Sequence, residues 1–160
     1  MAKIKELQKK YNLPKDDFWN LTGNVWIVKH DAVEKIAKME NVIFENPTIV
    51  EHSRGHCVLM GSATIIKEDK KIAEEWTFGE ADKKTNCKNS YIFAMAEKRL
   101  KDRLTLKLIS AYEYGIYSDT EADSFKKKNE VVVNDELPLN KSKKSWAKNK
   151  IQPSNVEELF

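Results

Sequence analysis

Two of the three arginines in the chain lie on one predicted helix, at a spacing that could bind an anion. Arg99, Arg103 and Lys107 follow one another at intervals of four residues, so on a helix they form a single row. The planar guanidinium group donates paired hydrogen bonds to phosphate or carboxylate oxygens. The chain uses 25 Lys and only 3 Arg, so arginine at two positions of this row indicates a specific contact.

This basic row runs through the apolar arc of the helix, where a charge is costly unless it is paired or reaches water. Three interpretations stay open. The cations could pair with carboxylates of a preceding hairpin (Glu74, Glu75 or Glu80), reach solvent along their aliphatic stems, or line a groove that an anion occupies. The core stripe of this helix is expected to consist of Phe93, Ala96, Leu100, Leu104, Leu108 and Ala111. On the side opposite this stripe, Lys98, Lys101, Asp102 and Thr105 are expected to face solvent.

Positive charge gathers around this helix although the whole chain has a net charge of only +3. Between residues 83 and 107 there are eight basic residues and two acidic ones, Glu97 and Asp102. Such a cluster is typical of a phosphate-binding surface, and a solvated Lys-rich face is the alternative. The candidate nucleic-acid contacts are Arg99, Arg103, Lys98, Lys107, Lys83, Lys84, Lys88 and Tyr91. Trp76 alternates with Ile72 and Phe78, which predicts a place in the core.

Other chemistries find weaker support in the sequence. The carboxylates Glu74, Glu75, Glu80 and Asp82, with Lys98 downstream, could hold Mg²⁺ in a small nuclease, but their spacing matches no nuclease motif. His52, His56 and Cys57 lack the second ligand pair of a structural zinc site. Neither a catalytic Ser-His-Asp array nor a glycine-rich nucleotide loop is present. We therefore expect no cofactor, no metal and no enzymatic activity.

The elements that must position these residues indicate an α+β fold. We expect a bent antiparallel sheet of three to four strands, including a hairpin over 57–79, packed on one long amphipathic helix from about 90 to 112. The short flanking elements are expected as follows: helices over 3–12, 32–40 (capped by Asp31) and 119–127 (capped by Ser118 or Asp119), and strands near 24–29 and 41–51.

The composition changes after about residue 128, which predicts one domain over 1–128 and a mostly disordered tail over 129–160. The tail has a basic part with one tryptophan, Lys141–Lys150. It ends in an acidic and apolar tip that could bind a replication or recombination protein: Glu157, Glu158, Leu159 and Phe160. No signal peptide or membrane-spanning segment is evident, so we expect no membrane contact and a cytoplasmic location, with a viral protein in a bacterial host cell as one such case.

The order of these elements resembles the Rad-fifty-two-like single-strand annealing proteins, which include recombinases of bacteriophages. The resemblance covers roughly residues 23–125. It is carried by the hairpin, the loop "GEADKKTN" (79–86), the helix "YIFAMAEKRLKDRLTLKLI" (91–109) and the closing "YGIYSDTEADSF" (114–125). The short Lys-rich tail differs from the large partner-binding region of longer members.

The resemblance implies DNA-backbone contacts at Arg99 and Arg103, weaker ones at Lys98 and Lys107, and a groove mouth lined by Lys83, Lys84 and Lys88. It also implies a homo-oligomer, as a ring or filament, that anneals single-stranded DNA without nucleotide hydrolysis or metal. The expected function is therefore annealing of complementary strands in recombination or replication. A metal-dependent nuclease and a non-enzymatic adaptor that docks a partner through its tip are the alternatives.

Overall fold

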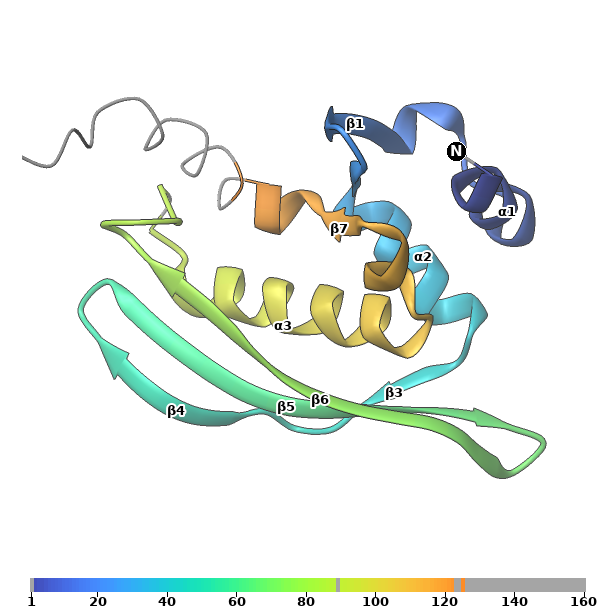
Figure 1. The fold of residues 1–160 in the computed structure, drawn as a ribbon. Helices are drawn as coiled ribbons and strands as arrows, with labels where there is room; N and C mark the ends of the chain where they lie inside the picture. The colour runs from blue at the N-terminus through green and yellow to red at the C-terminus, as the bar shows by residue number, and fades with distance from the viewer. Residues whose placement is uncertain (1, 89, 123–124, 126–160) are drawn as a thin grey trace, which may run out of the picture.

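The computed structural model describes residues 2–88, 90–122 and 125, and Figure 1 shows the long helix α3 lying between a curved sheet and a layer of shorter elements. The helices are α1 (Ala2–Tyr11), α2 (His30–Met39) and α3 (Ile92–Leu108), with 3₁₀ turns at Lys15–Asp17, Ala111–Tyr114 and Asp119–Glu121. The strands are β1 (Phe18–Thr22), β2 (Val25–Val28), β3 (Val42–Phe44), β4 (Thr48–Ser53), β5 (His56–Lys67), β6 (Lys70–Asp82) and β7 (Ile116–Ser118). The predicted α+β class is confirmed.

The larger sheet is built around the long strand β5. One edge of β5 pairs antiparallel with β3 and β4, and the other edge pairs with β6 along almost its whole length. Figure 1 shows β5 and β6 bending around α3. The predicted hairpin over 57–79 is confirmed and is longer than expected. Its tight turn is made by Glu68 and Asp69, both with positive φ.

Small residues on the inner face of this sheet allow α3 to approach closely. Alternation along β6 directs Ala73, Gly79 and Ala81 toward the helix. A Cβ added to Gly79 would overlap the carbonyl oxygen of Ala96 and lie 2.6 Å from the Leu100 nitrogen. The backbone of α3 therefore rests directly on the strand, and only glycine fits there.

The other side of α3 is also covered, by α2 and by the small sheet β1–β2–β7, in which β2 and β7 are parallel. Asp102 and Thr105, predicted to face solvent, are each only 1% exposed beneath this layer. The prediction was wrong because it assumed that only the apolar side of the helix is covered by other elements. In the structure α3 is covered on two opposite sides. Lys98 and Lys101 are exposed, as predicted.

The helix starts differ in part from those predicted. Lys29, not Asp31, is the N-cap of α2, and no side chain caps this helix. Tyr91 is the N-cap of α3. The cap at Ser118 is confirmed, because its hydroxyl accepts from the Thr120 nitrogen and a capping box forms with Glu121.

The tail predicted over 129–160, with its candidate tip Glu157, Glu158, Leu159 and Phe160, lies outside the described residues. Among the helices of the described part, none has both the length and the hydropathy that a bilayer span requires.

Candidate nucleic-acid interface

The basic row of α3 faces β6 and binds its main chain. Three cations spaced four residues apart donate to three carbonyl oxygens spaced two residues apart: Arg99 to Glu80 at 2.8 Å, Arg103 to Phe78 at 2.8 Å and Lys107 to Trp76 at 2.7 Å. Four helical residues rise about 6 Å and two strand residues about 6.6 Å, so the two repeats match. The row thus satisfies the carbonyl groups along the edge of β6 that β5 leaves unpaired.

Arg99 is the most deeply buried member of this row, with 3% of its surface exposed. Its guanidinium also donates to the Thr120 carbonyl (2.8 Å) and to both the side-chain oxygen (3.0 Å) and the carbonyl (2.5 Å) of Asn86. It ties β6, the loop after it and the segment after β7 to the helix. This geometry supports a structural role, in place of the DNA-backbone contact expected from the sequence.

Arg103 and Lys107 are paired with carboxylates. Arg103 Nε lies 2.7 Å from Glu121 Oε1, and Lys107 Nζ lies 2.9 Å from Glu75 Oε2. The interpretation of pairing with the hairpin therefore holds for Lys107, whereas the partner of Arg103 comes from the 3₁₀ turn after β7. Tyr112 donates to the second oxygen of Glu121 at 2.9 Å, and burial, together with this carboxylate, raises the pKa of its hydroxyl far above the usual value.

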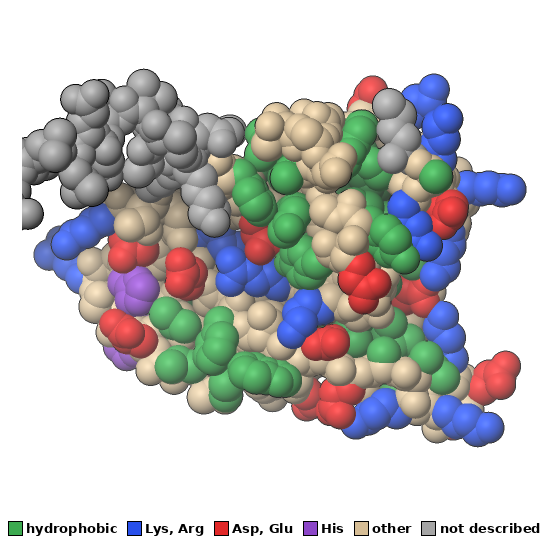
Figure 2. Space-filling view, in the orientation of Figure 1, with side chains coloured by type: hydrophobic (Ala, Val, Ile, Leu, Met, Phe, Trp, Pro, Cys, Tyr) green, Lys and Arg blue, Asp and Glu red, His purple; other side chains and the backbone are tan. Residues whose placement is uncertain are grey.

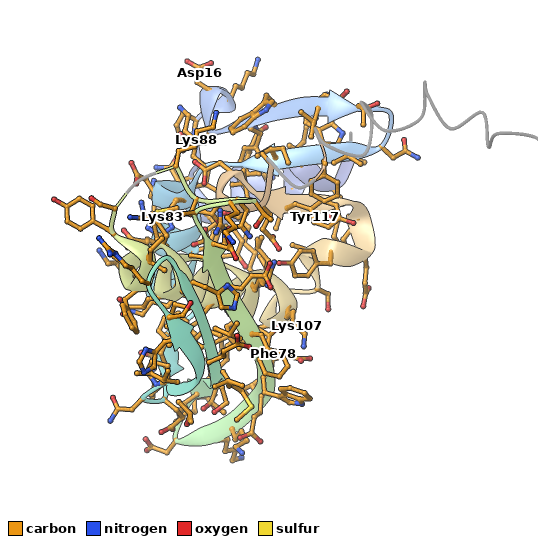
Figure 3. All side chains as sticks on the ribbon, turned by 90° about the vertical axis from the view of Figure 1, so that its left-hand side faces the viewer. Asp16, Phe78, Lys83, Lys88, Lys107 and Tyr117 are labelled. Carbon is orange, nitrogen blue, oxygen red and sulfur yellow. The ribbon has the colours of Figure 1, made fainter. Side chains whose placement is uncertain are left out.

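Other predicted cations remain exposed: Lys83, Lys84 and Lys88 on the loop after β6, and Lys98 on α3. Figure 2 shows a small group of Lys or Arg side chains at the left end of the molecule, where this loop lies, beside Asp, Glu and His side chains; other Lys and Arg side chains lie along the right side. In Figure 3, Lys83 and Lys88 extend from the loop, whereas Lys107 lies beside Phe78 of β6. These four lysines, together with Tyr91, are called the basic end below.

Lys98 lies between two hollows of the surface. The first, of about 490 Å³, is lined by Lys88 and Lys98, with Asn86, Thr120 and the buried Arg99 in its wall and Asp119 as its acidic member. The second, of about 370 Å³, is lined by Lys98, Lys101 and Tyr91, and its acidic members are Glu34 and Glu97. The structure thus brings four predicted residues together around the first two turns of α3 and the loop before it: Lys88, Tyr91, Lys98 and Arg99.

Tyr91 is the most exposed aromatic residue of the described part, at 73%. It precedes the first turn of α3, where its ring stands free of the core. Helical periodicity groups Phe93 with the core residues Ala96 and Leu100, yet Phe93 is 49% exposed, and its ring lies 6.1 Å from that of His52 on β4. Sequence periodicity missed this residue because β4 lies beyond the part of the sheet that α3 covers.

Trp76 is 59% exposed, so its predicted place in the core was wrong. The side chains of β6 do alternate between two faces as predicted, but Trp76 and Phe78 lie on the outward face. The other face of the strand, with Gly79 and Ala81, packs against α3. The rings of Trp76 and Phe78 contact each other edge to face with centroids 5.6 Å apart.

The carboxylates considered for a nuclease do not converge. Glu75 points toward α3, whereas Glu74 and Glu80 occupy outward positions of the same strand. Asp82 accepts from the Lys84 nitrogen and pairs with His56 at 3.1 Å, and both contacts lower its pKa. No group of three or more His, Cys, Asp or Glu side chains suited to a metal ion occurs within residues 2–88, 90–122 and 125.

A buried polar cluster joins α2, α3 and β7. Asp102 accepts from the Ser118 hydroxyl and from Thr120 (3.1 Å), and its other oxygen lies 2.7 Å from His30 Nδ1. The serine contacts the aspartate and not the histidine, so the histidine does not activate it as a nucleophile. The cluster therefore holds the two layers together.

No protein-family model matches this chain, and comparisons with curated proteins and with solved structures give no significant match.

Proposed function

We propose that this protein binds single-stranded DNA at the basic end and promotes annealing of complementary strands without hydrolysing ATP. The observation that carries the proposal is the position of Lys98, which lies between a hollow shared with Lys88 and a hollow shared with Tyr91. Proteins that bind single strands combine cations for the phosphates with aromatic rings on which bases stack. Lys88 and Lys98 supply the first group, and Tyr91 supplies the second.

The proposed DNA-binding site is the basic end, whereas the sequence suggested the basic row of α3. Arg99, Arg103 and Lys107 would have to give up contacts with β6 in order to bind phosphate, whereas Lys83, Lys84 and Lys88 are exposed. Phosphate contacts leave the Watson–Crick edges of the bases unoccupied, so a second strand can pair with them. That arrangement gives annealing without covalent chemistry.

One basic end offers only a few phosphate contacts, and binding of single strands strengthens with each contact added. We therefore propose that several copies act together as a homo-oligomer in the cytoplasm and present their basic ends to one strand. In this arrangement the protein holds single strands with their bases exposed, and the free energy that drives annealing comes from base pairing.

The test is fluorescence anisotropy of a labelled single-stranded oligonucleotide across a salt series, with the full chain. The double variant Lys88→Ala/Lys98→Ala should weaken binding and reduce the slope of log K against log salt by about 1.4, because each lost phosphate contact on a single strand contributes about 0.7. Tyr91→Ala should weaken binding about 5- to 150-fold, the range expected for one lost stacked base. The matched control Lys5→Ala/Lys9→Ala removes the same charge from exposed positions on α1, far from the basic end.

Equal losses in the two double variants would reject the basic end as the binding site. If it is confirmed, annealing is measured by energy transfer between complementary labelled strands without nucleotide. Shortening of the labelled strand in the presence of Mg²⁺ would instead indicate a nuclease. If the full chain does not bind the oligonucleotide, the proposal is rejected and the adaptor alternative is favoured.

A further inference from the structure

The outward face of the larger sheet is an exposed apolar surface. Trp76 and Phe78 of β6 lie on it opposite Ser62 and Met60 of β5, and Thr48 of β4 lies on the far side of Met60. Trp76, Phe78 and Met60 are 59%, 39% and 37% exposed. Figure 2 shows hydrophobic side chains gathered over this part of the sheet. Contiguous exposed apolar surface of this kind is typical of an interaction site.

Carboxylates surround this surface, and one of them, Glu74, forms an ion pair with Lys71 at 2.6 Å. Strand pairing gives the outward positions that flank the aromatic pair: Glu74 lies opposite Thr64, Glu80 and Glu51 lie on either side of Val58, and Asp82 lies opposite His56. Within residues 48–65 and 74–82, which form β4, most of β5 and the second half of β6, no outward position carries Lys or Arg. The one basic residue in these two ranges, Arg54, lies in the turn between β4 and β5. We call this surface the acidic-aromatic face; it consists of Met60, Trp76 and Phe78 with the carboxylates of Glu51, Glu74, Glu80 and Asp82. Its charge favours a cationic occupant over nucleic acid.

We propose that the acidic-aromatic face binds the basic segment Lys141–Lys150 of the same chain. This segment reads KSKKSWAKNK, with five lysines and one tryptophan. Lysine ammonium groups are attracted both to carboxylates and to the faces of Trp and Phe rings. Trp146 adds apolar area that can cover Met60 and Phe78.

The chain is long enough for this contact. Fifteen residues separate Phe125, the last described residue, from Lys141, and an extended chain spans at most about 3.3–3.6 Å per residue, or about 50 Å in total. A domain of this size has a radius of gyration of about 13–14 Å, so the segment can reach any of its faces. A segment on the same chain also acts at a high effective concentration, which favours it over a free competitor of equal chemistry.

The consequence is a division of charge between two faces. The basic end stays accessible to nucleic acid, while the five lysines of the segment Lys141–Lys150 are held on the acidic-aromatic face, away from the basic end. The inference does not depend on the proposed function, because the contact forms without nucleic acid and its test contains none.

The test is paramagnetic broadening of NMR signals in the full chain. A nitroxide label is attached at Ser145→Cys, where it reacts selectively because Cys57 and Cys87 are buried. We expect the amide signals of Met60, Trp76 and Phe78 and the indole signal of Trp76 to lose intensity, while those of α1 keep theirs. Glu74→Lys/Glu80→Lys should remove the effect. The matched control Glu6→Lys/Glu113→Lys makes the same change in charge at exposed positions elsewhere and should retain it.

Three results would overturn the inference. The first is unchanged intensity over the acidic-aromatic face in the labelled protein. The second is broadening that persists in Glu74→Lys/Glu80→Lys. The third is broadening of the same signals when ¹⁵N protein without a label is mixed with labelled ¹⁴N protein, because a second copy would then be the occupant.

Discussion

The guanidinium of Arg99 donates a 2.8 Å hydrogen bond to the main-chain carbonyl of Glu80, which places a positive charge of the long helix inside the protein. The contact gives the buried guanidinium a hydrogen-bond acceptor and gives the carbonyl group of the strand a donor. Among the described strands only β5 pairs with β6, so the carbonyl groups on the outer edge of β6 lack a strand partner there, and an open edge can pair with other chains. Side chains from α3 satisfy three of these carbonyls, so the row blocks that edge.

The first prediction concerns the stability that Arg99 provides. Arg99→Ala should lower the free energy of unfolding by about 3 kcal/mol or more, because it leaves several buried carbonyl oxygens without donors. Arg99→Lys should recover little, since an ammonium group cannot reach acceptors on three segments at once. Urea denaturation measures both. Lys98→Ala, the exposed neighbour, should change the value by no more than about 0.5 kcal/mol.

Equal stability of Arg99→Ala and Lys98→Ala, together with loss of DNA binding only in Arg99→Ala, would contradict the structural role. It would return Arg99 to the phosphate contacts that the sequence suggested.

The second prediction concerns the contact between α3 and β6. Gly79→Ala should destabilise the protein by about 1–3 kcal/mol or more, because its Cβ would meet main-chain atoms of Ala96 and Leu100 that cannot move independently. Gly61→Ala should cost less, because its Cβ would meet only the mobile end of the Leu100 side chain, at 2.9 Å. Thermal unfolding of the two variants compares them directly. A larger loss for Gly61→Ala would show that the helix and the strand are not in tight contact at Gly79.

Much of the fold could be predicted from local sequence signals. The hairpin of β5 and β6 follows from alternating apolar residues on either side of Glu68 and Asp69, and the long helix follows from its periodicity. Periodicity separates two faces of an element but does not tell which one is covered. Trp76 was placed in the core for this reason, although the opposite face, with Ala73 and Gly79, is the one against α3.

The candidate site was harder to predict because its key contacts involve the main chain. Arg99 and Arg103 have carbonyl oxygens as partners, and a carbonyl leaves no mark in the sequence. Spacing could therefore show the row but could not decide between a groove, a salt bridge and solvent. The exposure of Lys88 and Lys98 agrees with the sequence, whereas their contact with DNA remains a prediction.

The third prediction concerns acid sensitivity. Glu40 is only 5% exposed, and burial would raise its pKa, but contacts with Lys10 (2.5 Å), Lys67 (2.6 Å) and Tyr11 (2.7 Å) outweigh burial and lower the pKa from 4.5 to about 2. The unfolded chain therefore binds the proton more tightly than the folded one. The stabilisation is present above about pH 4.5 and is lost as the pH falls toward 2.

Glu40→Gln should remove this loss between pH 4.5 and 2, at the cost of lower stability at neutral pH. Urea denaturation at several pH values tests the prediction. Glu6→Gln, on exposed α1, serves as the control and should keep the dependence of the parent protein. An unchanged acid dependence in Glu40→Gln would assign the effect to other carboxylates.

The fourth prediction concerns the buried pair of His30 and Asp102. The hydrogen bond from His30 to the Asp102 carboxylate raises the pKa of the imidazole above 6.5, against the opposing effect of burial. The protonated form stabilises the fold fully below about pH 6.5, and this stabilisation is lost as the pH rises through the higher folded pKa. The free energy of unfolding should thus decline over that range.

NMR titration of the imidazole protons of His30 measures this pair directly. In the parent protein His30 should titrate above 6.5. Asp102→Asn removes the negative charge that favours imidazolium, so it should lower the His30 midpoint and flatten the decline in stability. A His30 midpoint at or below 6.5 in the parent protein would contradict the prediction even if the variant fails to fold, since it would mean that burial outweighs the bond to Asp102.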